Sequence, residues 1–439
     1  MSTHPFDAVS QGVKGGRSLR GKLTIWQKFF CMLHVIASHQ GRPADDPIFA
    51  LNREATERSM GGEAIVNATV GALLEDDGQL VVLPTAARVV HEVKAEQWAA
   101  YAPLAGSPDF LRAVMDDLLG TQPALREAAV AVATPGGTGA LRHAIANFLE
   151  PGQSLLTTSY FWGPYQTLAD EADRKVAVFP MFASDGSLDV DGLDRAMAAQ
   201  VTQQGRVLLF LNDPCHNPTG YSMRLAEWRA VVERVGHYAD KVPVALLVDC
   251  AYFAYGPGEP RAFLGELLPL LGRAALLFAW TASKTFTHYG LRVGAIVACI
   301  ADPDERRGTM AALSYSCRGT WSNCNSGGLA AITRLLTDPA LARACNEERA
   351  RSIRMLAARV SAFNALAKAR GLRYPRYDGG FFVTVFDEDA ARKAQAMRKA
   401  GVYVVPQLSK AGTAGALRVA LCSVAERDVA RLVDALASA

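Results

Sequence analysis

Short apolar runs alternate with helical patterns from about Ala100 to about Ser352. The apolar runs are AVAVATP, SLLTTS, KVAVFPM, RVLLFLN, VALLVDC, ALLFAW and GAIVACI. Amphipathic stretches such as LAEWRAVVERVGHYAD lie between several of them. Near-continuous apolar strands separated by helices predict an α/β fold, with a mostly parallel sheet covered by helices on both faces.

The pattern changes after Ser352. A long Ala- and Arg-rich helical stretch is followed by FFVTVF, a second helix, GVYVVP, LRVALC and a closing helix. This order predicts a smaller α+β domain. We expect an N-terminal arm over residues 1–60, a first piece of the small domain over 61–90, a large domain over 91–345 and the small C-terminal domain over 346–439.

Composition and charge narrow the class of protein. The chain has 439 residues, of which 50% are hydrophobic, enough for more than one core. Its 46 basic and 43 acidic residues nearly cancel, which gives no reason to expect a nucleic-acid or membrane-surface partner. The eight cysteines form no CxxC pair, and we expect reduced thiols in a cytoplasmic protein.

The N-terminal run FFCMLHVIAS is similar to a signal-peptide core. Lys28 and His34 interrupt it, however, and no A-x-A site follows cleanly. We therefore expect an amphipathic arm that docks on the body of the protein or on a second subunit. No segment reaches the about 18 apolar residues that a membrane span needs.

Polar residues follow the apolar runs directly, where open parallel sheets bind ligands. AVAVATP leads into GGTGALRHAIANFL, so Gly136, Gly137, Thr138 and Gly139 open a helix whose free N–H groups suit a phosphate. No GK[ST] follows, which excludes a Walker A loop. Glycine at a strand-to-helix turn is also common for purely structural reasons.

Three more strand ends carry candidate ligand-binding residues. Trp162, after SLLTTS, can stack on a planar ring, or belong to the core. Asn217, in the turn DPCHNPTG, can donate a hydrogen bond to a ligand oxygen. Asp249 ends VALLVDC, with Tyr252 three residues later; a buried carboxylate there needs a cationic partner, unless it only caps a helix.

Lys284 follows ALLFAW in the segment TASKTFTHYGLRVG. Thr281, Ser283 and Arg292 surround it with hydroxyls and a guanidinium. Together the strand ends suit one ligand with a phosphate, a flat ring, a ring nitrogen protonated beside a carboxylate, a ring oxygen, and an aldehyde for an amine to attack. Pyridoxal 5′-phosphate (PLP) has all five, whereas NAD leaves Lys284 unexplained and ATP leaves Asp249 unexplained.

These motifs resemble those of class I aminotransferases of PLP fold type I, in the aspartate and aromatic branch. The resemblance covers about Asn67 to the C-terminus and rests on motifs in family order: NATVGALLEDDG, YAPLAGSPDFLRA, GGTGAL, WG, HNPTG, DCAY, SKTF…GLRVG and LRVAL. It implies a large PLP-binding sheet domain, a smaller α+β domain and a homodimer with shared active sites. It also implies ping-pong amino transfer between an L-amino acid, dicarboxylic or possibly aromatic, and a 2-oxo acid.

The resemblance also implies roles for the candidate residues. Lys284 would hold PLP covalently and act as general base and acid, Asp249 would keep the ring nitrogen protonated, and Asn217 and Tyr252 would bond the ring hydroxyl. Trp162 would stack on the ring. The phosphate would be held by Gly137, Thr138, Thr281, Ser283 and Arg292, with Tyr101 from the other subunit. No metal is expected.

Two arginines are implied to bind the substrate. Arg418 in ALRVAL matches the family arginine for the α-carboxylate, and Gly71 should lie close to the same group. Trp162 and Asn217 are expected beside the substrate as well. Arg318 in RGTWSN resembles the arginine that pairs with a dicarboxylate side chain across the dimer; the alternative is a surface arginine in a loop.

The chain departs from the family pattern at four places. Cys324 and Asn325 replace prolines after WSN, WGPY replaces Asn-His after WG, GALL lacks a tyrosine, and LRVALC differs in its downstream context. We expect all four on the substrate side of the site, so the substrate stays open.

Three alternative functions remain. Another fold-type I PLP enzyme, such as a lyase or decarboxylase in biosynthesis, would use the same Lys284 and Asp249. A non-catalytic PLP-fold domain would usually lack the lysine or carry a DNA-binding domain. A nucleotide-binding protein would read a phosphate through GGTG but would leave Lys284 unexplained.

Overall fold

The computed structural model describes residues 34–36, 39–42, 46–407 and 414–438. The chain divides into a unit of residues 1–46 and a compact unit of residues 47–439. The expected arm falls largely outside the described residues, apart from helix α2 (Pro47–Met60), which belongs to the compact unit.

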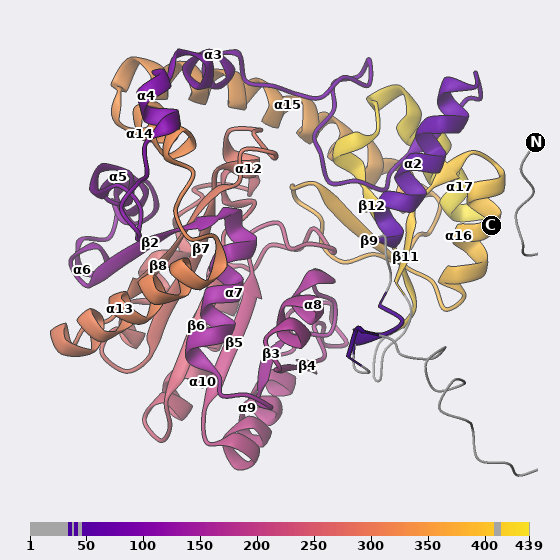
Figure 1. Ribbon diagram of the computed structural model, residues 1–439. Coiled ribbons are helices and arrows are strands. Elements are labelled where there is room, and N and C mark those ends of the chain that lie inside the picture. The colour runs from indigo at the N-terminus through magenta and orange to yellow at the C-terminus, as the bar shows by residue number, and fades with distance from the viewer. Residues whose placement is uncertain (1–33, 37–38, 43–45, 408–413, 439) are drawn as a thin grey trace, which may run out of the picture. The chain divides into compact units, whose positions relative to one another are not determined.

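The compact unit contains a seven-stranded sheet, which we call the first sheet. Its strands lie in the order β2-β8-β7-β6-β5-β3-β4 (Figure 1). Strands β3 to β7 are parallel, and β8 is antiparallel to both of its neighbours. The strands are β2 (Ala129–Pro135), β3 (Ser154–Thr158), β4 (Lys175–Phe179), β5 (Val207–Asn212), β6 (Val244–Asp249), β7 (Ala275–Thr281) and β8 (Val293–Cys299). The predicted α/β fold with a mostly parallel sheet is confirmed.

Alternate residues of these strands pack on opposite faces, as a side-chain period of two requires. In β5, Leu208 and Phe210 pack under one set of helices: α7 (Gly136–Phe148), α8 (Pro164–Glu171) and α13 (Pro303–Thr320). Leu209 and Leu211 pack under the other set: α5 (Pro108–Leu119), α9 (Val190–Gln204), α10 (Leu225–Ala239) and α14 (Ser326–Thr337). Both faces are therefore buried, which explains the continuous apolar runs.

Short polar side chains begin several of these helices. Asp189 accepts a hydrogen bond from the N–H of Gly192 at the start of α9. Asp302 accepts from the N–H groups of Asp304 and Glu305 at the start of α13. Each carboxylate satisfies backbone donors that lack a partner within the helix.

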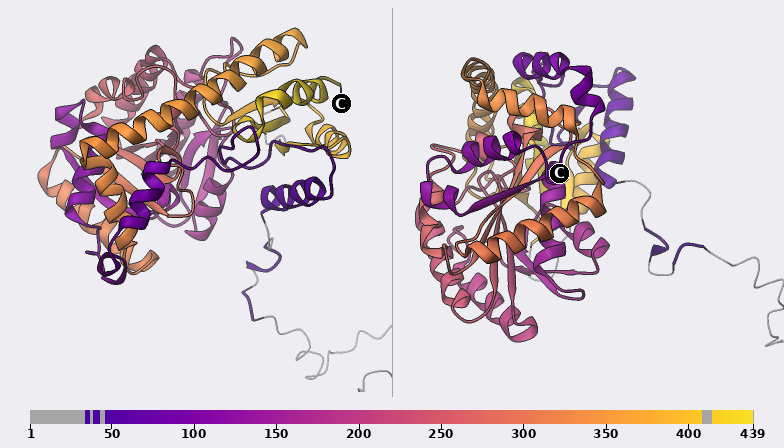
Figure 2. Two further views of the ribbon diagram at one scale, coloured as in Figure 1. Left: turned by 90° about the horizontal axis from the view of Figure 1, so that it is seen from above. Right: turned by 60° about the vertical axis from the view of Figure 1, so that its left-hand side comes forward.

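A second sheet lies beside the first, built from β11 (Val405–Gln407), β12 (Ala416–Ala420) and β9 (Phe382–Phe386), all antiparallel (Figure 1). Next to it, β1 (Val66–Asn67) pairs in parallel with β10 (Val402–Tyr403). These strands share an apolar core with α15 (Pro339–Ala369), α16 (Ala390–Lys399) and α17 (Val429–Ser438). Figure 2 shows α15 running from the helices around the first sheet to the second sheet.

Shorter elements complete the unit. They are α3 (Pro84–Glu92), α4 (Ala95–Ala99), α6 (Pro123–Glu127), α11 (Phe263–Glu266), α12 (Ala282–Thr285), and the 3₁₀ turns η2 (Phe253–Tyr255), η3 (Leu268–Leu270), η4 (Leu421–Ser423) and η5 (Glu426–Asp428). None of the helices in the described part of the chain is long and apolar enough to cross a membrane. The division of residues 61–439 into a large and a small domain stays a prediction.

Candidate active site

A cavity of about 320 Å³ lies at the carboxyl ends of β5, β6 and β7, beside the start of α7. We call it the first cavity. Ten of the eleven residues predicted to bind the cofactor line it: Gly137, Thr138, Trp162, Asn217, Asp249, Tyr252, Thr281, Ser283, Lys284 and Arg292. The reasoning from strand ends therefore identified one real cavity.

Lys284 lies on the single turn α12, immediately after β7. Its Nζ donates a hydrogen bond to the Gly71 carbonyl at 3.2 Å and lies 4.4 Å from the centre of the Tyr289 ring. Burial, with a smaller contribution from Arg292, lowers the pKa of Lys284 to about 8. The neutral amine, which is the nucleophilic form, is therefore accessible close to neutral pH.

Asp249 ends β6 and is buried. Its Oδ2 accepts from the Tyr165 hydroxyl at 2.8 Å, and its Oδ1 accepts from the Ala251 N–H at 3.2 Å. Burial raises the pKa of Asp249 to about 6, although Tyr165, Ala251 and the charge of Lys284 oppose the rise. A cationic ligand group beside this carboxylate would hold it ionised.

Tyr165 corrects one expectation about the departures from the family pattern. It is the tyrosine of WGPY, and it is fully buried between Phe161 and Phe210. Because its hydroxyl donates to Asp249, this departure lies beside a residue predicted to bind the cofactor. The expectation that all four departures lie on the substrate side was wrong here, since the strand-end pattern does not show which helix residue reaches back to β6.

Asn217 lies in the loop between β5 and α10. Its N–H donates to Asn212 Oδ1 at 2.6 Å, and its side chain lines the first cavity together with Tyr252. Within the described residues its Oδ1 is buried and has no hydrogen-bond partner. A buried amide oxygen in that state indicates a group that a ligand completes.

The start of α7 forms a concave cradle. Pro135 at the N-cap offers no side-chain hydrogen bond, so the first backbone N–H groups of α7 stay available. Gly136 has φ +69°, and a Cβ there would lie 2.5 Å from Arg292 Nη2. Arg292 Nη1 donates to Ser283 Oγ at 3.3 Å. Free N–H groups, a guanidinium and hydroxyls suit a phosphate dianion.

A second cavity of about 230 Å³ adjoins the first, since Trp162 and Asn217 line both. Arg418 of β12 lines the second cavity; its Nη2 donates to the Thr69 carbonyl, and its guanidinium lies 4.9 Å from the Phe382 ring centre. Gly71 packs against the same ring, which leaves no space for a Cβ. A guanidinium at this place can bind a carboxylate through two parallel hydrogen bonds.

Three predicted site residues line neither cavity: Gly71, Tyr101 and Arg318. Tyr101 is 92% exposed. Arg318, near the end of α13, is also exposed, and its Nη1 donates to Ser322 Oγ at 3.0 Å. Asn325, one of the residues that depart from the family pattern, caps α14: its Oδ1 accepts a hydrogen bond from the Gly328 N–H at 3.0 Å. The roles of Tyr101 and Arg318 across a subunit boundary stay predictions, because they need a second chain.

The sequence did not predict every residue that lines the cavities; four examples are Asn212, Tyr289, Phe49 and Ile48. Asn212 and Tyr289 border the first cavity, and both have a usable signal: Asn212 ends β5, and Tyr289 lies between Lys284 and Arg292. Phe49 borders the first cavity and Ile48 the second. Both come from α2, far from any strand end, and no local pattern marks them.

Among the described residues, no group of three or more His, Cys, Asp or Glu side chains could hold a metal ion.

The chain is similar in sequence to known proteins. The family described as "Aminotransferase class I and II" matches residues 63–436. The aromatic-amino-acid aminotransferase of Pseudomonas aeruginosa is 34% identical over 235 residues, which is 51% of this chain and 55% of that protein. The tyrosine aminotransferase of Klebsiella pneumoniae is 28% identical over 375 residues, covering 82% of this chain and 91% of that protein.

Solved structures show the same likeness. An aminotransferase from Anaerococcus prevotii has a TM-score of 0.85 at 28% identity, covering 92% of this chain and 99% of that one. An aromatic-amino-acid aminotransferase from Burkholderia pseudomallei, described as covalently bound to pyridoxal phosphate, has a TM-score of 0.75 at 23% identity, covering 92% and 99%. At 23% identity, the likeness to the Burkholderia pseudomallei structure shows a shared fold alone.

Proposed function

The chain belongs to the class I and II aminotransferases and is a PLP-dependent enzyme of that family, and we propose that it transfers an amino group between an L-amino acid and a 2-oxo acid by a ping-pong mechanism. One observation carries the proposal: the amine of Lys284 and the carboxylate of Asp249 border a single cavity that also includes the cradle at the start of α7.

The residues fit PLP. The buried Oδ1 of Asn217 is an acceptor that the ring hydroxyl of PLP would satisfy, and Gly136 leaves beside Arg292 a space that a Cβ would fill. We assign the phosphate to the cradle of Gly137, Thr138, Thr281, Ser283 and Arg292. Trp162 would stack on the ring, and Asn217 and Tyr252 would bond its oxygen.

PLP, when bound, supplies an electron sink for the bond that breaks at the substrate α-carbon. Lys284 would hold the cofactor covalently, and its free amine would accept a proton from the substrate α-carbon and deliver it to the cofactor carbon that carried the aldehyde, for which its pKa of about 8 suits near-neutral conditions. Asp249 would keep the ring nitrogen protonated, and that cation would in turn keep Asp249 ionised.

Our proposal for the substrate class starts from Arg418, which lines the second cavity. Arg418 would bind the α-carboxylate with both arms of its guanidinium, and Gly71 would lie close to the same carboxylate. We propose dicarboxylic amino acids as preferred substrates, with Arg318 from the other subunit pairing with the side chain. Relatives named as aspartate and aromatic-amino-acid aminotransferases support both this preference and an aromatic alternative.

We further propose a homodimer with shared active sites and a cytoplasmic location. Tyr101, which would reach the partner's phosphate, is exposed and does not line the cavities of its own chain, which supports sharing. The seven cysteines among the described residues are free and buried, which supports a reducing compartment.

The test is an absorbance spectrum of the purified protein with PLP, before and after adding L-aspartate, L-glutamate, L-phenylalanine or L-alanine singly. We expect a visible band that one donor converts to a near-ultraviolet band, and no visible band in Lys284→Ala. A visible band that none of these donors converts would keep PLP binding, contradict the proposed dicarboxylic and aromatic substrates, and favour a lyase or decarboxylase or a specialised biosynthetic substrate. No band at all would contradict PLP binding.

A further inference from the structure

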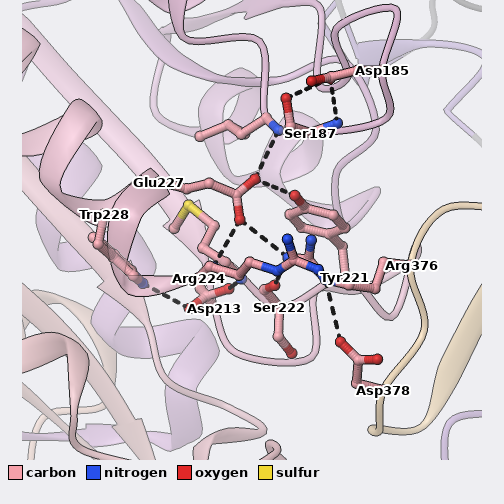
Figure 3. Close-up of polar contacts among 12 residues, drawn as sticks. Asp185, Ser187, Asp213, Tyr221, Ser222, Arg224, Glu227, Trp228, Arg376 and Asp378 are labelled. Carbon is pink, nitrogen blue, oxygen red and sulfur yellow. Dashed lines mark hydrogen bonds and ion pairs between the residues drawn. The ribbon is translucent and has the colours of Figure 1, made fainter.

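A polar network outside both cavities closes the loop that carries Asn217 (Figure 3). The loop leaves β5 at Asp213 and returns to α10 at Met223. Three hydrogen bonds join its outgoing and returning arms, at 2.8, 3.0 and 2.8 Å: Met223 N–H to Asp213 Oδ1, Cys215 N–H to Ser222 Oγ, and His216 N–H to the Tyr221 carbonyl. Asn217 follows the last of these bonds, so the position of its amide depends on this closure.

Glu227, in the first turn of α10, holds the returning arm from outside. Its carboxylate accepts from the Leu188 N–H at 3.0 Å, the Arg224 N–H at 2.8 Å and the Tyr221 hydroxyl. Burial alone would raise the pKa of Glu227, but these donors and Arg376 outweigh it and lower the pKa. Glu227 is therefore a charged group with every oxygen engaged, and its side chain is only 12% exposed.

Arg376, in the segment that precedes β9 of the second sheet, contacts the same returning arm and Glu227. Its Nη2 donates to the Ser222 carbonyl at 2.6 Å and to Glu227 Oε2 at 3.1 Å, and its Nε lies 3.2 Å from Asp378 Oδ2. Its guanidinium stacks 4.4 Å from the centre of the Tyr221 ring. One side chain thus holds two residues of the returning arm, and Figure 3 shows Arg376 between Tyr221 and Asp378.

The segment after Arg376 also contacts the tip of the loop. Thr384 Oγ1 donates to the Pro218 carbonyl at 3.0 Å. Gly220, with φ +73°, packs so closely against the Phe382 carbonyl and the Tyr377 ring that a Cβ would not fit. The loop therefore lies between its closing network and β9, with little room to move.

We propose that Glu227 and Arg376 are positioning residues for Asn217: their ion pair holds the returning arm, and so fixes where the Asn217 amide enters the first cavity. The inference rests on the proposed role of Asn217 toward the cofactor. A half-buried charge pair with shared donors suits this task, since loss of one partner leaves the other charge and its neighbours to rearrange. Neither residue touches the cavity, so each acts through the loop.

The readout is the pH midpoint at which the visible band of the PLP-loaded protein changes. We expect Asn217→Ala to move this midpoint, and Glu227→Gln and Arg376→Met to move it in the same direction by a smaller amount. We also expect kcat/KM to fall by roughly 10- to 100-fold, as small misplacements near a reacting centre do. A pair with a purely structural role would lower the melting temperature and leave the midpoint unchanged.

The matched control is Arg229→Met. Arg229 lies on the same helix and pairs with Glu266 at 2.9 Å, away from the loop, and its loss should not move the midpoint. The double variant Asn217→Ala with Arg376→Met should have the midpoint of Asn217→Ala alone, because the pair has no effect once the amide is gone.

Two outcomes would overturn the inference. A wild-type midpoint in both Glu227→Gln and Arg376→Met, while Asn217→Ala shifts it, would leave the proposed function intact and remove the positioning role. A wild-type midpoint in Asn217→Ala would refute the proposed contact of Asn217, and the inference with it. If Arg376→Met does not fold, Arg376→Lys keeps the charge but loses the two-armed geometry, and a partial shift is expected.

Discussion

Burial changes the acid–base behaviour of two side chains that border the first cavity. It lowers the pKa of Lys284 to about 8 and raises the pKa of Asp249 to about 6. Each shift favours the neutral form, because a charge is costly away from water. The cavity thus contains a nucleophile that is available near neutral pH and a carboxylate that a cationic ligand stabilises as an ion.

The pH dependence of PLP attachment follows from Lys284. Apoprotein mixed with PLP should gain its visible band at a rate that rises with pH, with a midpoint of about 8, because only the neutral amine attacks the aldehyde. Stopped-flow absorbance measures this rate, and Lys284→Ala provides the control without a band. A midpoint near 10.5, the ordinary value, would contradict the burial argument.

Tyr165 should control the affinity for PLP through Asp249. Tyr165→Phe removes the hydroxyl that donates to the carboxylate, so the pKa of Asp249 should rise further and less of it should be ionised at pH 7. A hydrogen bond to a charged group contributes about 1.5–3 kcal/mol, so we expect PLP to bind at least roughly tenfold more weakly, and worse at lower pH. Fluorescence titration measures the affinity.

The control for this prediction is a tyrosine–aspartate pair elsewhere. The Tyr238 hydroxyl donates to Asp194 Oδ1 at 3.1 Å, far along α10 from the cavity. Tyr238→Phe should leave PLP binding unchanged. Equal affinities for Tyr165→Phe and the wild type would show that Asp249 keeps its charge without Tyr165.

At the scale of elements, the start of α7 and the segment from α12 to β8 are fitted to each other. Gly136 faces Arg292, and Gly294 of β8 packs on the Gly136 backbone, where a Cβ would lie 2.5 Å from the Gly136 carbonyl carbon. The two glycines let a helix terminus and a strand approach closely enough for N–H groups and a guanidinium to converge.

Gly136→Ala should therefore weaken PLP binding by at least about tenfold, because the Cβ displaces Arg292 and φ +69° disfavours alanine. The control is Gly290→Ala in the same segment, where a Cβ meets nothing within 4 Å. Isothermal titration with PLP and a thermal melt of the apoprotein separate binding from stability. Unchanged affinity in Gly136→Ala would mean that the phosphate does not use this cradle.

The sequence predicted those parts of the site that local patterns record. Asp249 and Lys284 directly follow continuous apolar strands, so their places at one sheet edge followed from topology. Tyr165, 84 residues before its partner Asp249, carries no such mark. Glu227 and Arg376, 149 residues apart, meet only because β9 packs on the loop after β5. Contacts of this kind depend on how elements pack, which residue type and spacing do not encode.

At the scale of the whole molecule, the proposed roles of Tyr101 and Arg318 depend on a second chain. Tyr101 and Arg318 lie outside both cavities of their own chain, so their predicted roles can be met only by a partner subunit. A C₂ dimer would place equivalent residues of each subunit at the site of the other.

Subunit mixing tests the sharing of sites. Lys284→Ala and Arg318→Ala should each be inactive toward a dicarboxylic donor alone. Mixed after mild dissociation, they should recover roughly a quarter of the wild-type activity, because half of the dimers are hybrids with one intact site. Lys284 and Asp249 line the same cavity of one chain, so we expect no recovery when Lys284→Ala is mixed with Asp249→Ala. Recovery in that mixture would mean that these two residues act across chains. Full activity in a monomeric fraction would contradict the shared site.

The pairing of β1 with β10 has a consequence for biosynthesis. Val66 finds its partner only at Val402, so the second core combines residues from near both ends of the chain. At about 5–20 residues per second, a ribosome needs roughly 15 to 70 s to add the intervening residues. During that time β1 has no strand to pair with, and it must be kept from nascent neighbours on the same polysome, while the strands of the first sheet can already assemble.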